Sequence, residues 1–233
     1  MNIRAELRTN FSIQHIQSAF FFARQCKAIE GAHDGSYNAE SIANCRAYAT
    51  GAVFAAVAFL DATAGEIFLD ASEPDGGSLK DQPIDVRRNF EEIWTKSLSK
   101  KSAALPKLEK ALELAGTPEI CSGSRFNKEE RPYLDVALVV KLRNRLIHYE
   151  PAWLPAELEH RKQVPQRYEF AEQLRGRFAE SAMMGGGSPL FHKILGYGCA
   201  KWAAESALAL ADEFYYRMGI VPRYDHVRAA LAE

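Results

Sequence analysis

A short segment of the chain, KLRNRLIHYEPAW, gathers side chains that could act on a phosphodiester. It holds Arg143, Asn144, Arg145 and His148 within six positions. Histidine titrates near neutral pH and can move a proton, whereas a guanidinium can contact two phosphate oxygens at once. Together these groups could hold an anion beside a proton carrier. The alternative, which periodicity alone favours, is that Lys141, Arg143 and Arg145 only complement the negative end of a helix dipole and pair with carboxylates.

The element that must position these residues is a helix predicted over 131–147. Asn127 and Glu130 resemble a capping box, a common start of a helix. Leucines then repeat at every fourth position: Leu134, Leu138, Leu142 and Leu146. After Glu150 the run PAWLP forbids regular helix, because each proline biases the preceding residue away from helical geometry. We therefore expect His148 at the C-terminal end of this helix.

A period of 3.6 residues dominates the rest of the chain and predicts an all-α fold. The segment after Asn38 continues to about Asp70 and is apolar on more than one face, which is typical of the central helix of a bundle. A surface loop is expected over 70–83, where turn-forming residues gather. Further helices are expected over 12–30, 85–94, 105–116, 166–178 and, as one long helix, from Phe191 to Phe214.

The motif resembles that of a known family. Arg143, four intervening residues and His148 fit the R-x4–6-H motif of the HEPN superfamily, and Asn144 fits the polar residue that often follows its arginine. HEPN domains are all-helical and are found in bacterial toxins, defence nucleases and CRISPR-associated ribonucleases. The resemblance covers about 12–151, where a long apolar helix carrying acids (AFLDATAGEIF) precedes the motif. It implies a single HEPN-like helical domain over 1–233, with a core at about 12–151, extra helices in the middle, and C-terminal helices at about 166–218 packed on it.

The resemblance also implies an activity. HEPN ribonucleases cleave RNA without a metal or another cofactor, by attack of the 2′-hydroxyl on the adjacent phosphate. In this chain His148 would move the proton, Arg143 would stabilise charge on the phosphate oxygens, and Asn144 would orient the imidazole or hold the phosphate. Arg145 and Tyr149 would support the site or bind RNA. The family context implies a toxin or defence role, with a cognate antitoxin protein as a possible partner.

Two geometric questions follow from the helix. Five positions place Arg143 and His148 about 140° apart, so they do not converge on an ideal helix. Either the last turn unwinds before Pro151, or two motif copies share a cleft in a homodimer, as the resemblance implies and as we expect. Asp61 and Glu66 are separated by the same angle, so only one should reach this cleft. We expect Glu66 there and Asp61 as the buried partner of an arginine.

Composition limits the other possibilities. The 233 residues carry 29 Lys and Arg against 30 Asp and Glu, so the net charge of −1 counts against a protein that coats DNA. A basic segment could contact phosphates, although such runs are more often solvated helix faces: Lys96, Lys100, Lys101, Lys107 and Lys110. The four cysteines lie far apart, and no histidine pair has zinc-ligand spacing. We therefore expect reduced thiols, no metal site and a cytoplasmic protein.

No membrane segment is expected. The longest uncharged apolar stretch runs from Ala47 to Leu60 and is too short to cross a bilayer core of about 30 Å. The first ten residues carry charges and lack the apolar region of a secretory signal. RNA or a nucleotide is the expected ligand. Two other functions remain open: a catalytically silent HEPN-like module that binds a nucleotide, RNA or a protein, and a helical scaffold of unrelated function.

Overall fold

The computed structural model describes residues 9–95, 103–115, 126–148, 170, 172–183 and 190–232. Within these ranges the regular structure is entirely helical, and no strand is present. The predicted all-α fold class is therefore confirmed, whereas its HEPN-like detail stays a prediction.

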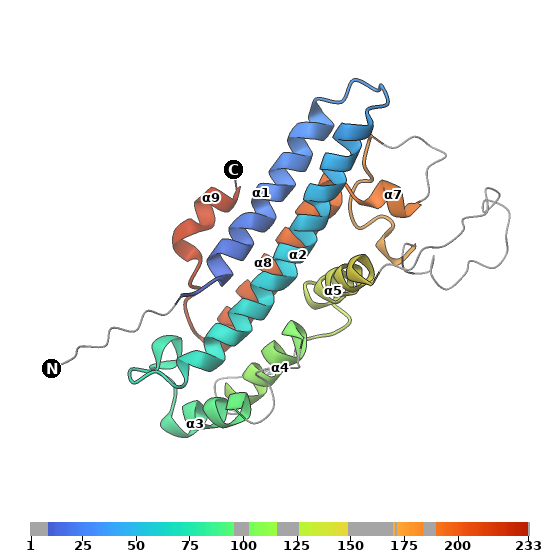
Figure 1. Ribbon diagram of the computed structural model, residues 1–233. Helices are drawn as coiled ribbons and strands as arrows, with labels where there is room; N and C mark the ends of the chain where they lie inside the picture. The colour runs from blue at the N-terminus through green and yellow to red at the C-terminus, as the bar shows by residue number, and fades with distance from the viewer. Residues whose placement is uncertain are drawn as a thin grey trace. The chain divides into compact units, whose positions relative to one another are not determined.

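The helix bounds agree closely with the sequence prediction for the first half of the chain (Figure 1). In chain order the elements are α1 (Ser12–Gly31), α2 (Ala39–Asp70), η1 (Gly77–Leu79), α3 (Ile84–Ile93), α4 (Ala104–Ala115), α5 (Tyr133–Ile147), α7 (Leu190–Ile194), α8 (Tyr197–Met218), η4 (Asp225–Val227) and α9 (Arg228–Ala232). The expected cap of α2 is present, since the Ser41 amide donates to Asn38 Oδ1 at 3.0 Å.

The chain divides into two compact units, each built from segments that are far apart in sequence. Unit 1 consists of Met1–His15, Ala58–Phe126 and Ala211–Glu233, and unit 2 of Ile16–Val57 and Asn127–Leu210. Both α2 and α8 carry residues of each unit. The prediction of a single domain over 1–233 stays a prediction.

Unit 1 has an aromatic core. Phe59 and Tyr215 each meet Tyr224 edge to face, with ring centroids 5.4 and 5.7 Å apart. Phe68 packs against Phe90 with a centroid distance of 5.0 Å. All five side chains are fully buried. Such pairs add about 0.5–1.5 kcal/mol each beyond the burial of their area, so they hold the end of the chain in unit 1.

Unit 2 packs through small side chains. In this unit α1 runs antiparallel beside the first part of α2 (Figure 1), as the contacts of Cys26 with Cys45 and of Phe22 with Tyr48 require. The buried faces of its helices are rich in alanine, which lets helix axes approach closely. These alanines are Ala19 and Ala23 of α1, Ala49, Ala52 and Ala56 of α2, and Ala200, Ala203, Ala204 and Ala207 of α8.

The prediction of one long last helix was wrong. The chain breaks between α7 and α8 at Leu195 and Gly196. Glu30 and Ser181 lie so close to Gly196 that a Cβ there would overlap with the Glu30 carboxylate. The chain bends where only glycine allows this approach. The predicted buried face is nevertheless confirmed for Leu195, Cys199, Trp202, Ser206, Leu210 and Phe214, while the side chain of Phe191 lies outside the described residues.

The length of α2 bears on the expectation that the chain has no membrane segment. Among the described residues α2 is long and apolar enough to cross a membrane by length and composition, because the charged residues that bracket 47–60 do not interrupt the helix. However, 67% of its most apolar window is buried inside the structure, which is typical of a core helix. The expectation of no membrane contact stays a prediction.

Candidate functional site

Helix α5 carries the motif and ends where the sequence predicts. Its first residue is Tyr133, because Asn127 caps a turn instead of the helix: Asn127 Oδ1 accepts from the Glu129 amide at 3.1 Å. The last helical residue is Ile147. The His148 amide still donates to the Asn144 carbonyl at 2.9 Å, and at φ −103° and ψ 51° the chain then leaves the helix.

The three central motif side chains are available to a ligand. Asn144 and His148 are exposed, and Arg143 is half-buried. Within the described part of the chain, none of these three side chains forms a hydrogen bond or an ion pair. The carboxylate partner that the alternative interpretation requires for Arg143 is therefore absent from these residues. Tyr149, which the sequence also assigns to the site, lies outside the described residues.

The helix geometry keeps Arg143 and His148 apart. The hydrogen bond from His148 to Asn144 shows that α5 stays regular through the motif, so the expected divergence of about 140° is retained. Between Arg143 and Ile147 the helix is not unwound, and residues 149–151, where the last turn could unwind, lie outside the described residues. On one copy of the chain the two side chains therefore leave α5 in different directions.

Two further cations lie on the same helix face as His148. Lys141, Arg145 and His148 occupy positions i, i+4 and i+7 of α5. Lys141 Nζ donates to Gln173 Oε1 at 3.0 Å and lies 5.0 Å from the centroid of the Phe170 ring. The guanidinium carbon of Arg145 lies 5.3 Å from the same centroid. Both cations thus pack over one buried aromatic ring.

An acid in the first turn of α5 fixes the segment that supplies Phe170 and Gln173. Asp135 is 5% exposed and accepts from Arg131 Nε at 3.1 Å and from Arg177 Nη1 at 2.5 Å. Arg177 Nε also donates to the Gln173 carbonyl at 3.0 Å. Sequence reasoning missed this arrangement. Its signal was an aspartate on the apolar stripe of a helix, which requires a cationic partner when it is buried.

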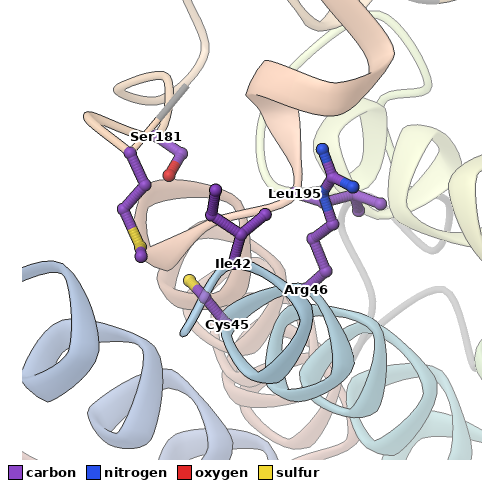
Figure 2. A pocket seen from close by; sticks show the side chains of 6 residues that line it. Ile42, Cys45, Arg46, Ser181 and Leu195 are labelled. Carbon is purple, nitrogen blue, oxygen red and sulfur yellow. The ribbon is translucent and has the colours of Figure 1, made fainter. Parts of the chain in front are cut away.

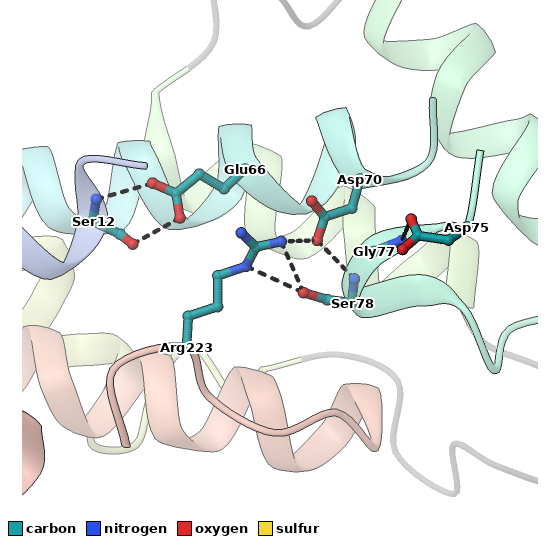
Figure 3. A network of polar contacts seen from close by, with 7 residues as sticks. All are labelled: Ser12, Glu66, Asp70, Asp75, Gly77, Ser78 and Arg223. Carbon is teal, nitrogen blue, oxygen red and sulfur yellow. Dashed lines mark hydrogen bonds and ion pairs between the residues drawn. The ribbon is translucent and has the colours of Figure 1, made fainter. Parts of the chain in front are cut away.

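The two acids proposed for the site belong to unit 1, whereas the motif belongs to unit 2. Glu66 is 6% exposed and caps the start of α1 by accepting from the Ser12 amide at 2.9 Å and from Ser12 Oγ at 2.7 Å (Figure 3). Asp61 was expected to be a buried partner of an arginine. It is instead partly exposed and pairs with Lys107 at 3.4 Å. The assignment of Glu66 to the cleft stays a prediction.

The basic segment is partly used for structure. Lys107 pairs with Asp61 and lies 6.0 Å from the ring centroid of Trp94, while Lys110 pairs with Glu113 at 2.9 Å. Both lysines therefore have carboxylate partners, and the Lys107 side chain is only 13% exposed, which counts against phosphate contacts at these two positions. Lys96, Lys100 and Lys101 lie outside the described residues.

Within unit 1, Asp70 and Arg223 form a buried ion pair (Figure 3). The fully buried Asp70 accepts from the Arg223 guanidinium and from the Ser78 amide, the latter at 3.0 Å. Burial by itself would raise the pKa of Asp70, but the hydrogen bonds from Ser78 and the charge of Arg223 outweigh it and lower the pKa. Gly77, with φ near +50°, lets the loop approach Asp70 this closely.

A small hollow in unit 2 is filled so closely by its lining that it encloses no space for a water molecule (Figure 2). It is lined by Ile42, Cys45, Arg46, Ser181, Met183 and Leu195. Ser181 Oγ donates to Glu30 Oε1 at 2.7 Å. The neighbouring Cys26 thiol has its pKa raised by its contact with Cys45 and by burial, so it stays protonated. The Cys26 thiol is therefore a packing group and not a nucleophile.

Within the ranges that the structure describes, no group of three or more His, Cys, Asp or Glu residues lies close enough to hold a metal ion. Comparisons with models of protein families, with curated proteins and with solved structures found no match to this chain. The motif at the end of α5 is thus the feature on which a function is argued.

Proposed function

We propose that this protein is a metal-independent endoribonuclease of toxin or defence type. The observation that carries the proposal is the charge of the second half of α5. From Val136 to His148 the chain contains no acidic residue, and it places Lys141, Arg143 and Arg145 before the terminal histidine. Among the described residues, none of these cations pairs with a carboxylate. A polyanion such as RNA would supply the missing negative charge.

The reaction divides between a proton carrier and a charge stabiliser. The 2′-hydroxyl gives its proton to a base, its oxygen bonds to phosphorus, and the 5′-oxygen leaves with a proton. His148 serves as the acid or base because histidine is the side-chain type whose ordinary pKa lies closest to neutral pH. Arg143 contacts the phosphate oxygens, on which negative charge grows in the transition state. The products carry a 2′,3′-cyclic phosphate and a 5′-hydroxyl.

A second copy of the chain completes the site in this proposal. Arg143 and His148 diverge on a helix that is regular through the motif, so one phosphate cannot meet both side chains of a single copy. A two-fold dimer can place Arg143 of one protomer opposite His148 of the other. Asn144, exposed on the turn before His148, can hold the phosphate or orient the imidazole.

The proposal is tested by two substitutions. His148→Ala and Arg143→Ala should each reduce RNA cleavage by about a hundredfold or more, because both groups act on charges and protons that appear only in the transition state. Thermal melting should change little, since neither side chain has a hydrogen-bond partner in the described structure. Cleavage is measured in excess EDTA, and product ends are identified by mass spectrometry.

Arg175→Ala is the matched control, because Arg175 is exposed and its ion-pair partner among the described residues is Glu172, at 2.9 Å. It should cleave like the wild type. Unfolding of either motif variant would show that the pair is a structural element of the helix end. Binding of RNA by the wild type without cleavage would instead support the catalytically silent binding module.

A further inference from the structure

Lys141 and Arg145 form a pair of like charges to which the described part of the chain brings no carboxylate partner. They are four positions apart on one face of α5, about 6 Å along its axis, and both contact the Phe170 ring. Like charges at this spacing repel each other and destabilise a helix. The structure nevertheless holds both in place, and among the described residues their partners are the neutral amide of Gln173 and the aromatic ring of Phe170.

The segment around Phe170 holds these two cations in a defined arrangement. Phe170 is 1% exposed, so its faces are covered and it cannot stack on a base. Gln173 gives Lys141 a hydrogen-bond acceptor without neutralising its charge. The Gln173 backbone is in turn anchored through Arg177 to the buried Asp135. The cations are thereby ordered before any ligand arrives, while both remain exposed.

We propose that Lys141 and Arg145 form a phosphate-binding subsite for single-stranded RNA, with Phe170 and Gln173 as positioning residues. The subsite lies on the same face of α5 as His148 and would hold phosphates that flank the scissile bond. It rests on the proposed ribonuclease function for its role in the reaction. The binding itself is a separate property, because a phosphodiester backbone is attracted to paired cations whether or not it is cleaved.

The test uses a short single-stranded RNA in which every 2′-hydroxyl is methylated, so that it cannot be cleaved by the proposed route. Its affinity for the full chain is measured by fluorescence anisotropy between about 50 and 200 mM salt. The double variant Lys141→Gln/Arg145→Gln should lower the slope of log affinity against log salt by about 1.4, which corresponds to two lost phosphate contacts on a single strand. The control is Lys201→Gln/Arg175→Gln, which removes the same charges where each has a carboxylate partner.

Gln173→Leu tests the positioning role. It removes the acceptor of Lys141 but no charge, so affinity should fall by about fivefold while the salt slope stays at the wild-type value. The melting temperature of the variant is measured alongside. Because Gln173 is exposed, it should stay at the wild-type value, whereas a general structural defect would lower it.

The outcomes separate the subsite from the activity. A reduced slope in the double variant supports the subsite even if the wild type cleaves no RNA. A slope equal to that of the control variant, or no binding of the methylated RNA by the wild type, overturns the subsite even if His148→Ala abolishes cleavage of natural RNA.

Discussion

Asp70 is a carboxylate removed completely from water, and its surroundings keep it charged. Because Ser78 and Arg223 lower its pKa, the unfolded chain binds a proton more readily than the folded chain near pH 4. The stability that Asp70 contributes is therefore complete above its ordinary pKa of about 3.9 and is lost as the pH falls through the lower value of the folded state.

We expect Asp70→Asn to cost about 3 kcal/mol at pH 7, the lower end for a broken buried pair, because Arg223 is partly exposed. The variant should also lose stability less steeply than the wild type as the pH falls below about 4. Urea unfolding followed by circular dichroism at a series of pH values measures both effects. Asp81→Asn, in the exposed loop, serves as the control. If the stability of Asp70→Asn fell with pH as steeply as that of the wild type, Asp70 would not be a source of the acid sensitivity.

At the scale of single residues, the sequence predicted the position and exposure of the motif side chains better than the ion-pair partners of the acids. His148 and Asn144 are exposed at the end of a helix, as the motif and the following prolines indicated. The pairs Asp61–Lys107 and Asp135–Arg177 could not be predicted, because the two members of each pair lie more than 40 residues apart in sequence. Pairing at that distance depends on tertiary packing, which no local pattern encodes.

At the scale of elements, caps and breakers determined most helix ends. The ends of α1 to α4 lie within about two residues of the prediction, since Asn38, the loop after Asp70 and Pro83 act locally. The break before α8 was missed because its cause is not local. The side chain that leaves no room for a Cβ at Gly196 belongs to Glu30, which lies far away in sequence on α1.

Gly198 provides a test of this packing. A Cβ at Gly198 would overlap with the backbone carbonyl of Ala179, which cannot rotate away as a side chain can. Gly198→Ala should therefore destabilise the protein by about 2–3 kcal/mol, despite the higher helix propensity of alanine. Gly31→Ala is the matched control, because no atom lies within 4 Å of its added Cβ. Thermal and urea unfolding should show Gly198→Ala to be clearly less stable than Gly31→Ala. Equal stabilities of the two variants would show that the backbone at Ala179 can move away from the added Cβ at no cost in free energy.

At the scale of the whole molecule, the divergence of Arg143 and His148 predicts a homodimer with a composite site. Sedimentation at micromolar concentration should show two copies. Mixing the inactive variants Arg143→Ala and His148→Ala should restore about a quarter of wild-type cleavage, because half of the dimers are mixed and each of these keeps one of two sites. A monomer, or mixtures that stay inactive, would contradict the composite site.

The interleaved course of the chain has a consequence for how its gene can change. Unit 1 consists of three stretches of sequence and unit 2 of two, and the helices α2 and α8 each contain residues of both units. No single block of the gene specifies either unit. Exchange of one stretch with another gene would therefore replace only part of a unit, and the foreign part would have to pack against the native remainder. The two units have to be inherited, and to vary, together.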